Sequence, residues 1–159
     1  MNNELNLAAP CLFGVESIAA DEFRRMGFNE VAAENGRVKL KGDLNMLARA
    51  NICSRFAERI MIVLGEFTLN LRRRTLLKNG RNIELTQVEF QMIEYFFNNP
   101  DVALDRTDIL SKVWGTNYFG EEKIVDVNVR RLRMKVEDDP SQPQRLITVW
   151  GMGYKWNTH

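Results

Sequence analysis

Along the first 65 residues, apolar positions switch between the spacing of strands and the spacing of helices. This pattern predicts strands at residues 5–13, 30–34, 37–41 and 58–64 and helices at residues 15–26 and 43–51. Asn35-Gly36 suits a tight hairpin turn between the two middle strands, and Asp43 suits the N-terminal cap of the second helix. The order β-α-β-β-α-β predicts a ferredoxin-like fold for this half.

From Phe67 onward, the pattern changes to short strands, then helices, then a terminal hairpin. Strands are predicted at residues 67–71, 75–78, 82–85, 145–149 and 154–157. Thr86 and Glu89 form a capping box that begins a helix, and Asp105 caps a second helix. A third helix is predicted at residues 123–136. This order is typical of a winged helix-turn-helix, so the whole chain is expected to be α+β.

The helix predicted at residues 123–136 has two different faces. Its apolar stripe for the core consists of Val125, Val129, Leu132 and Val136. At about 100° per residue, the opposite side carries Lys123, Val127, Arg130, Arg131 and Met134. A helix fits the major groove of DNA, where arginine donates paired hydrogen bonds to guanine or phosphate and Val127 suits a thymine methyl group. We expect this face to contact duplex DNA; the alternative is a solvated charged face.

Several short motifs of the second half follow one another in a characteristic order. They are Leu85-Thr-Gln-Val-Glu-Phe90, Val113-Trp-Gly115, Asn117-Tyr-Phe-Gly120, Val125-Asp-Val-Asn-Val-Arg-Arg-Leu-Arg133, Glu137-Asp-Asp-Pro140 and Thr148-Val-Trp-Gly-Met-Gly-Tyr154. With them, residues 66–159 resemble the winged-helix effector domain of OmpR/PhoB response regulators of two-component systems. The resemblance implies a transcriptional regulator that binds specific double-stranded DNA, with residues 123–136 in the major groove and a wing near residues 150–153.

The same resemblance implies which side chains contact DNA. They are Lys123, Val127, Asn128, Arg130, Arg131, Arg133, Thr148 and Lys155. Asp126 is expected to orient a nearby arginine rather than to contact DNA. The wing departs from the family pattern, because Trp150 stands where relatives commonly have an arginine for the minor groove. Trp150 is expected to pack either on the core or against another subunit.

The resemblance also implies protein partners. The loop at residues 116–122 contains Asn117, Tyr118 and Phe119 and corresponds to a loop that contacts RNA polymerase in activators. The alternative is a loop that packs its aromatic rings into the core. Family members bind direct-repeat sites as pairs, so a homodimer is expected. The run Arg72-Arg73-Arg74, on a strand or turn, is either solvated or in contact with phosphate or RNA.

Motifs of the first half resemble a different family. They are Cys11-Leu-Phe-Gly-Val-Glu16-Ser, Glu34-Asn-Gly-Arg-Val-Lys-Leu, Gly42-Asp-Leu, Ala50-Asn-Ile and Arg59-Ile-Met-Ile-Val-Leu-Gly-Glu-Phe67. With them, residues 5–67 resemble the N-terminal ferredoxin-like domain of THUMP-containing RNA methyltransferases, which helps to present RNA. An RNA-binding protein that uses this domain is therefore the alternative function.

The two halves are predicted to be separate domains, residues 1–65 and 66–159. Gly65-Glu66-Phe67 ends the first motif pattern and begins the second, so no flexible spacer is expected. Either the halves share a rigid junction, or the chain is a non-natural fusion of two unrelated domains. Residues 1–65 are too few for the phosphorylated receiver domain of response regulators, so regulation by such a domain is not expected.

Composition further limits the classes of function that the chain can have. The 22 Lys and Arg residues nearly balance the 21 Asp and Glu residues, so a DNA-binding surface must concentrate its cations on one face. Cys11, Cys53 and the single His159 provide neither a disulfide framework nor a zinc site, and no metal or cofactor is expected. No nucleophile–base set is evident, so no catalytic residue or enzyme activity is expected.

The sequence also bears on the location of the protein. The longest apolar run, residues 60–64, is too short to span a membrane, and the first four residues lack the basic region of a signal peptide. A cytoplasmic protein without membrane contact is therefore expected.

Overall fold

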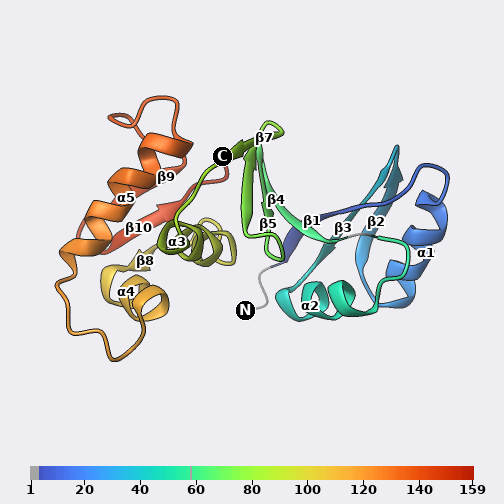
Figure 1. Cartoon of the computed structure of the whole chain (residues 1–159), viewed down its shortest axis with the longest axis horizontal. Coiled ribbons are helices and arrows are strands. Elements are labelled where there is room, and N and C mark those ends of the chain that lie inside the picture. Colours follow the sequence, from blue (N-terminus) through green and yellow to red (C-terminus); the bar gives the residue numbers. More distant parts are fainter. Residues whose placement is uncertain (1–3, 58) are drawn as a thin grey trace. The chain divides into compact units, whose positions relative to one another are not determined.

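The computed structural model describes residues 4–57 and 59–159, which form two compact units (Figure 1). The first unit ends at Arg74 and the second begins at Thr75. Two sequence expectations lie partly outside the described residues: the strand start expected at residue 58, and the absence of a signal peptide, which involves residues 1–3. Among the described residues, no helix combines the length and apolar character that crossing a membrane requires.

The first unit has the predicted β-α-β-β-α-β order. Its elements are β1 (Leu5–Pro10), α1 (Glu16–Arg25), β2 (Asn29–Glu34), β3 (Arg37–Gly42), α2 (Leu44–Cys53) and β4 (Met61–Leu64). The strands pair antiparallel in the order β2-β3-β1-β4, which is the ferredoxin-like arrangement. Asn35-Gly36 joins β2 to β3 as predicted, and the Asp43 carboxylate caps α2 by accepting a hydrogen bond of 2.8 Å from the Met46 amide.

One face of this sheet packs against the two helices to form the core of the first unit. In the β1–β3 ladder, Leu7 pairs with Leu40 and Ala9 with Val38, so their side chains point to the same side. All four are buried, together with Phe23 of α1 and Leu47 and Ala50 of α2. The alternating strand pattern and the apolar sides of the two helices therefore meet in one layer, which leaves the other face of the sheet for different contacts.

A fifth strand, β5 (Phe67–Asn70), pairs antiparallel with β4. Ile62 pairs with Leu69 and Leu64 with Phe67, so only Gly65 and Glu66 form the turn between the two strands. Gly65 has a φ of +57°, a backbone conformation that glycine adopts without steric cost. The expected meeting point of the two halves is therefore the turn of a hydrogen-bonded hairpin, while the domain boundary at residues 65 and 66 stays a prediction.

The second unit is the predicted winged helix. Its elements are β6 (Thr75–Lys78), β7 (Arg81–Ile83), α3 (Gln87–Phe97), β8 (Leu104–Asp105), α4 (Arg106–Trp114), α5 (Lys123–Val136), β9 (Leu146–Val149) and β10 (Gly153–Trp156). A three-stranded sheet has the order β8-β10-β9. The two-residue strand β8 was not predicted, because it is defined only by pairing with β10, for example Leu104 with Tyr154. Leu71, expected at the end of a strand, lies in the turn after β5.

The predicted helix caps of this unit are present. The Thr86 hydroxyl accepts a hydrogen bond from the Glu89 amide at 3.3 Å, and the Glu89 carboxylate accepts one from the Thr86 amide at 2.8 Å. Asp105 caps α4 by accepting a hydrogen bond of 2.8 Å from the Thr107 amide. These caps satisfy amides that the helices leave without partners, and they fix where α3 and α4 begin beneath α5.

Candidate nucleic-acid interface

Helix α5 buries one face and exposes the other, as its pattern predicted. The core stripe of Val125, Val129, Leu132 and Val136 is fully buried. The exposed side carries Lys123, Val127, Arg130, Arg131 and Met134. Val127 keeps 47% of its surface exposed between these cations. The helix therefore presents hydrogen-bond donors around an apolar side chain, a combination that matches base edges in the major groove.

The Asp126 carboxylate connects α5 to the rest of the unit. It accepts hydrogen bonds from the Tyr154 hydroxyl at 2.6 Å and from Arg106 Nε at 2.9 Å. Burial alone would raise the pKa of Asp126, but the hydrogen bonds from Tyr154 and Arg106 lower this pKa below its usual range. The expected pairing of Asp126 with an arginine is confirmed, and that arginine is Arg106 of α4, whereas the absence of a contact between Asp126 and DNA stays a prediction.

Arg133 connects α5 to the terminal hairpin. Its Nε donates to the Leu146 carbonyl at 2.8 Å, and its Nη2 donates to the Thr148 hydroxyl at 2.9 Å. Its guanidinium group also lies 5.6 Å from the centre of the Tyr154 ring. Burial lowers the pKa of Arg133. Two of the expected DNA contacts, Arg133 and Thr148, are therefore bonded to each other, and their contact with DNA stays a prediction.

Asn128 and Lys155 lie away from the exposed face of α5. Asn128 is only 7% exposed, and its Nδ2 donates to the Ile124 carbonyl at 2.8 Å. The side-chain amide nitrogen of Asn128 therefore already donates a hydrogen bond within the helix. A contact with phosphate would require a second hydrogen bond from the same nitrogen. Lys155 is half-buried on β10, where it pairs with Ile147. DNA contact by these two residues stays a prediction.

The loop between α4 and α5 exposes the three residues expected to contact polymerase. Asn117 and Tyr118 are exposed, and Phe119 is 100% exposed. The centre of the Tyr118 ring lies 6.2 Å from that of Trp114. The alternative expectation, in which the loop packs its aromatic rings into the core, is therefore wrong for Phe119.

Trp150 lies at the tip of the β9–β10 hairpin and is exposed. The expectation that it packs on the core is therefore wrong. The hairpin itself is well fixed, because the Glu137 carboxylate accepts hydrogen bonds from the amides of Gln144, Arg145 and Leu146. Glu137 therefore holds the loop between α5 and the wing in place, and the tip of the wing carries the exposed side chain of Trp150.

Several residues that hold this interface were missed by sequence reasoning. Arg106, Tyr154 and Glu137 all bond to groups on other elements, and nothing in their local sequence identifies those partners. For Arg106, only its position at the start of a helix could be predicted, because it follows the predicted cap Asp105. Tyr154 and Glu137 belong to the motifs that resemble the OmpR/PhoB family, but those motifs did not predict which groups the two side chains contact.

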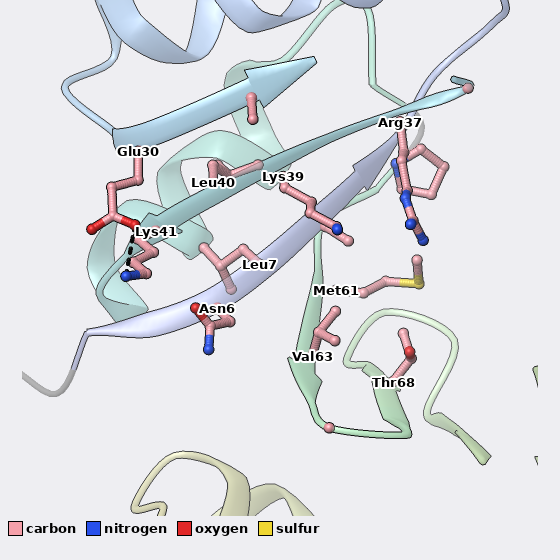
Figure 2. Close-up of a pocket in the computed structure, with 15 residues that line it drawn as sticks. Asn6, Leu7, Glu30, Arg37, Lys39, Leu40, Lys41, Met61, Val63 and Thr68 are labelled. Carbon is pink, nitrogen blue, oxygen red and sulfur yellow. Dashed lines mark ion pairs between the residues drawn. The ribbon is translucent and has the colours of Figure 1, made fainter. Parts of the chain in front are cut away.

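A second candidate surface is the face of the first sheet that α1 and α2 do not cover (Figure 2). It is hollowed into a pocket of about 580 Å³, a volume typical of ligand sites. Apolar side chains from β1 and β4, namely Ala8, Pro10, Met61 and Val63, contribute to its lining. Strand β3 contributes three cations at alternate positions, Arg37, Lys39 and Lys41.

All three cations of this pocket are ion-paired. The Glu34 carboxylate lies 2.9 Å from Arg37 Nε and 2.7 Å from Lys39 Nζ, and it has a lowered pKa because of these two partners. Lys41 Nζ lies 2.7 Å from the Glu30 carboxylate (Figure 2). The pocket is thus less positive than its row of basic residues implies, in contrast to the exposed face of α5.

Comparison with known families assigns the two units separately. Residues 80–156 match the family "Transcriptional regulatory protein, C terminal", and residues 6–61 match the family "RlmL ferredoxin-like domain". The uncharacterized transcriptional regulatory protein YcbL of Bacillus subtilis is 39% identical over 95 residues, covering 60% of this chain and 42% of that protein. The sensory transduction protein RegX3 of Mycolicibacterium smegmatis is 41% identical over 91 residues, covering 57% and 40%. The chain therefore spans less than half the length of these curated relatives.

Two solved DNA-binding domains are similar in structure to more than half of this chain. The DNA-binding domain of Klebsiella pneumoniae RstA, solved in complex with the RstA box, is 30% identical with a TM-score of 0.58, covering 62% of this chain and 98% of that one. The DNA-binding domain of Bacillus subtilis CssR is 35% identical with a TM-score of 0.50, covering 57% and 98%.

Proposed function

Since residues 80–156 belong to the OmpR/PhoB-type winged-helix DNA-binding domains and residues 6–61 to the RlmL-type ferredoxin-like domains, we propose that this protein binds a specific duplex DNA sequence and regulates transcription. On this proposal, α5 enters the major groove and the wing near residues 150–153 lies beside it. The observation that carries the proposal is the exposed face of α5, where Lys123, Arg130 and Arg131 surround Val127 above a fully buried apolar stripe.

The charge distribution supports DNA as the ligand. The chain has a formal net charge of only +1, so its attraction to phosphate depends on cations gathered locally. Arg130 and Arg131 are exposed, whereas Asp126 of the same helix is tied to Arg106 and Tyr154. The related RstA domain was solved with a DNA element, the RstA box, which supports the same class of ligand here.

The partners and the regulation extend this proposal. We propose that Asn117, Tyr118 and Phe119 form a contact with RNA polymerase, because Phe119 is fully exposed on a loop beside the DNA-binding helix. Two copies are proposed to bind adjacent half-sites as a homodimer. The ferredoxin-like half, residues 1–65, precedes the DNA-binding half, residues 66–159, in the sequence. The protein acts in the cytoplasm as a non-enzymatic regulator.

Selection from random duplex DNA with the whole protein tests the proposal. We expect an enriched motif, and its length and spacing also report whether one or two copies bind. The double variant Arg130→Ala/Arg131→Ala should enrich no motif, whereas Arg24→Ala, on an exposed position of α1, should select the same sequence as the unchanged protein. Failure of the unchanged protein to enrich any sequence would contradict the proposal.

RNA binding by the first unit is the second candidate function. The observation that favours it is the row of Arg37, Lys39 and Lys41, because alternate residues of a strand lie about 6.8 Å apart on one face and can follow a nucleic-acid backbone. RNA phosphates would have to replace Glu30 and Glu34 as the partners of these cations. Competition between duplex DNA and structured RNA at matched salt separates the candidates. Under the first proposal the selected duplex displaces RNA, and Lys39→Glu leaves DNA binding unchanged. Under the second, Lys39→Glu abolishes RNA binding and Arg131→Ala does not.

A further inference from the structure

Trp150 is an uncovered aromatic side chain, with 92% of its surface exposed. It occupies the second position of the turn Val149-Trp150-Gly151-Met152, which is closed by a hydrogen bond of 3.1 Å from the Met152 amide to the Val149 carbonyl. Gly151 has a φ of +74°, the positive φ that the third position of a type II turn requires. The backbone of the turn is therefore well defined, and it holds the indole ring out from the hairpin.

The hairpin is attached to α5 in a definite direction. At its base, the Leu146 amide donates to Glu137, the residue that follows α5, at 2.7 Å. Nearer its tip, the Tyr154 hydroxyl donates to Asp126 in the first turn of α5 at 2.6 Å. Strand β9 therefore runs back along α5 toward its N-terminal half, as the red hairpin beside the orange helix shows (Figure 1). Trp150 lies beyond this attachment.

From this placement, and resting on the proposed DNA binding by α5, we propose that Trp150 enters the minor groove next to the major-groove site and acts as an apolar wedge. An indole ring has no charge with which to bind phosphate. Its flat apolar surface instead packs against deoxyribose and the face of a base pair, and such wedges partly unstack the step that they enter. Pyrimidine–purine steps unstack at the lowest cost, so Trp150 makes the protein select a flexible step beside its α5 site.

Two observations favour DNA over a protein as the occupant. The hairpin that carries Trp150 is bonded to α5 through Arg133 and Asp126, so the tip moves with the proposed reading helix. The neighbouring half of α5 exposes Lys123 and Val127, which extends a surface of DNA-binding character up to the wing. Contact of Trp150 with a second copy of the chain remains as an outcome of the test.

The test uses the full chain and a selected duplex with 2-aminopurine at the step flanking the α5 site, because 2-aminopurine fluorescence rises when the base unstacks. Trp150→Ala is expected to weaken binding about tenfold or more and to abolish the fluorescence rise. The slope of log K against log salt should stay unchanged, because no phosphate contact is lost. Arg130→Ala is the matched control, which should reduce that slope by about one and retain the fluorescence rise. Thermal unfolding verifies that each variant is folded.

The outcomes separate this inference from the proposed function. Equal affinity and an equal fluorescence rise for Trp150→Ala and the unchanged protein would overturn the wedge and leave DNA binding intact. A reduced number of protein copies per duplex, with the fluorescence rise retained, would identify Trp150 as a contact between copies and also overturn the wedge. If the unchanged protein binds no duplex, both proposals fail.

Discussion

The hydroxyl group of Tyr154 on β10 donates a hydrogen bond of 2.6 Å to the Asp126 carboxylate on α5. The Tyr154 ring also lies 4.9 Å from the Arg106 guanidinium and 5.6 Å from that of Arg133. Burial raises the pKa of Tyr154, and the charge of Asp126 raises it further, so the phenol remains a donor at neutral pH. One buried side chain thus fixes α4, α5 and the wing relative to one another.

Replacing Tyr154 with phenylalanine removes this hydrogen bond and keeps the ring. We expect Tyr154→Phe to lower the free energy of unfolding by about 1.5–3 kcal/mol, because the hydroxyl that is removed donates its hydrogen bond to a charged carboxylate. Urea denaturation followed by circular dichroism measures the change. Tyr118→Phe, in the exposed loop, should alter the stability by no more than about 0.5 kcal/mol. Equal stability of both variants would show that the Tyr154 bond contributes nothing.

Arg131 lies on the exposed face of α5 and is predicted to contact DNA. Arg131→Ala should weaken binding to the selected site by about 1–3 kcal/mol if the guanidinium reads a base. If it contacts only phosphate, the loss should be similar on all sequences and the salt slope should fall by about one. Fluorescence anisotropy with the selected duplex and a scrambled duplex distinguishes these cases. Unchanged affinity of both Arg130→Ala and Arg131→Ala would refute docking by α5.

The Glu89–Lys135 pair predicts a loss of stability in acid. Glu89 is 2% exposed, and its carboxylate accepts hydrogen bonds from Lys135 Nζ at 2.6 Å and from the Thr86 amide. Burial alone would raise the pKa of Glu89, but Lys135 and Thr86 hold that pKa below its ordinary value. A lowered pKa in the folded state contributes stability above the unfolded pKa of about 4.3, and this stability is lost as the pH falls from there through the folded value.

Glu89→Gln tests this dependence. At pH 7 the variant should be less stable by about 1.5–3 kcal/mol, because a charged hydrogen bond is replaced by a neutral one. The difference between the variant and the unchanged protein should shrink below pH 4, when Glu89 becomes protonated. Thermal unfolding between pH 2 and pH 7 measures both curves, and Glu94→Gln, on the same helix, is the control. Parallel curves for Glu89→Gln and the unchanged protein would contradict the assignment.

Glu137 pins the loop that leads from α5 to the wing. Its carboxylate accepts from the amides of Gln144, Arg145 and Leu146 at 3.0, 3.0 and 2.7 Å. Glu137→Ala leaves these amides without their acceptor and should cost about 1–3 kcal/mol. Hydrogen exchange should accelerate at these amides more than at those of α3. Glu121→Ala, in the exposed loop, should leave the exchange pattern unchanged.

The features predicted from the sequence are those that depend on near neighbours. Both ends of α5 and both of its faces followed from helical spacing, and the caps at Asp43, Thr86 and Asp105 followed from side chains within three positions. Each of these signals is contained in a short window, because a helix brings residues three and four apart together.

The features that were not predicted depend on residues far apart in the chain. Arg106, Asp126 and Tyr154 form one cluster although they lie on three elements. Local spacing carries no signal for such a meeting, so the sequence identified an arginine partner for Asp126 without identifying which arginine. Asn128 is different, because its bond to Ile124 is a helical i to i−4 contact of the kind that short polar side chains often form.

The two-residue turn between β4 and β5 has a consequence for changes in chain length. Because side chains alternate along a strand, inserting one residue between Leu64 and Phe67 while keeping a two-residue turn would shift the pairing with β4 by one position. The buried Phe67 and Leu69 would then point to the opposite face of the sheet. Most connections tolerate insertions and deletions, but the turn between β4 and β5 has only two residues, Gly65 and Glu66, with which to accommodate them. The point where two motif families adjoin is therefore a position at which evolution can change residue identity far more easily than residue number.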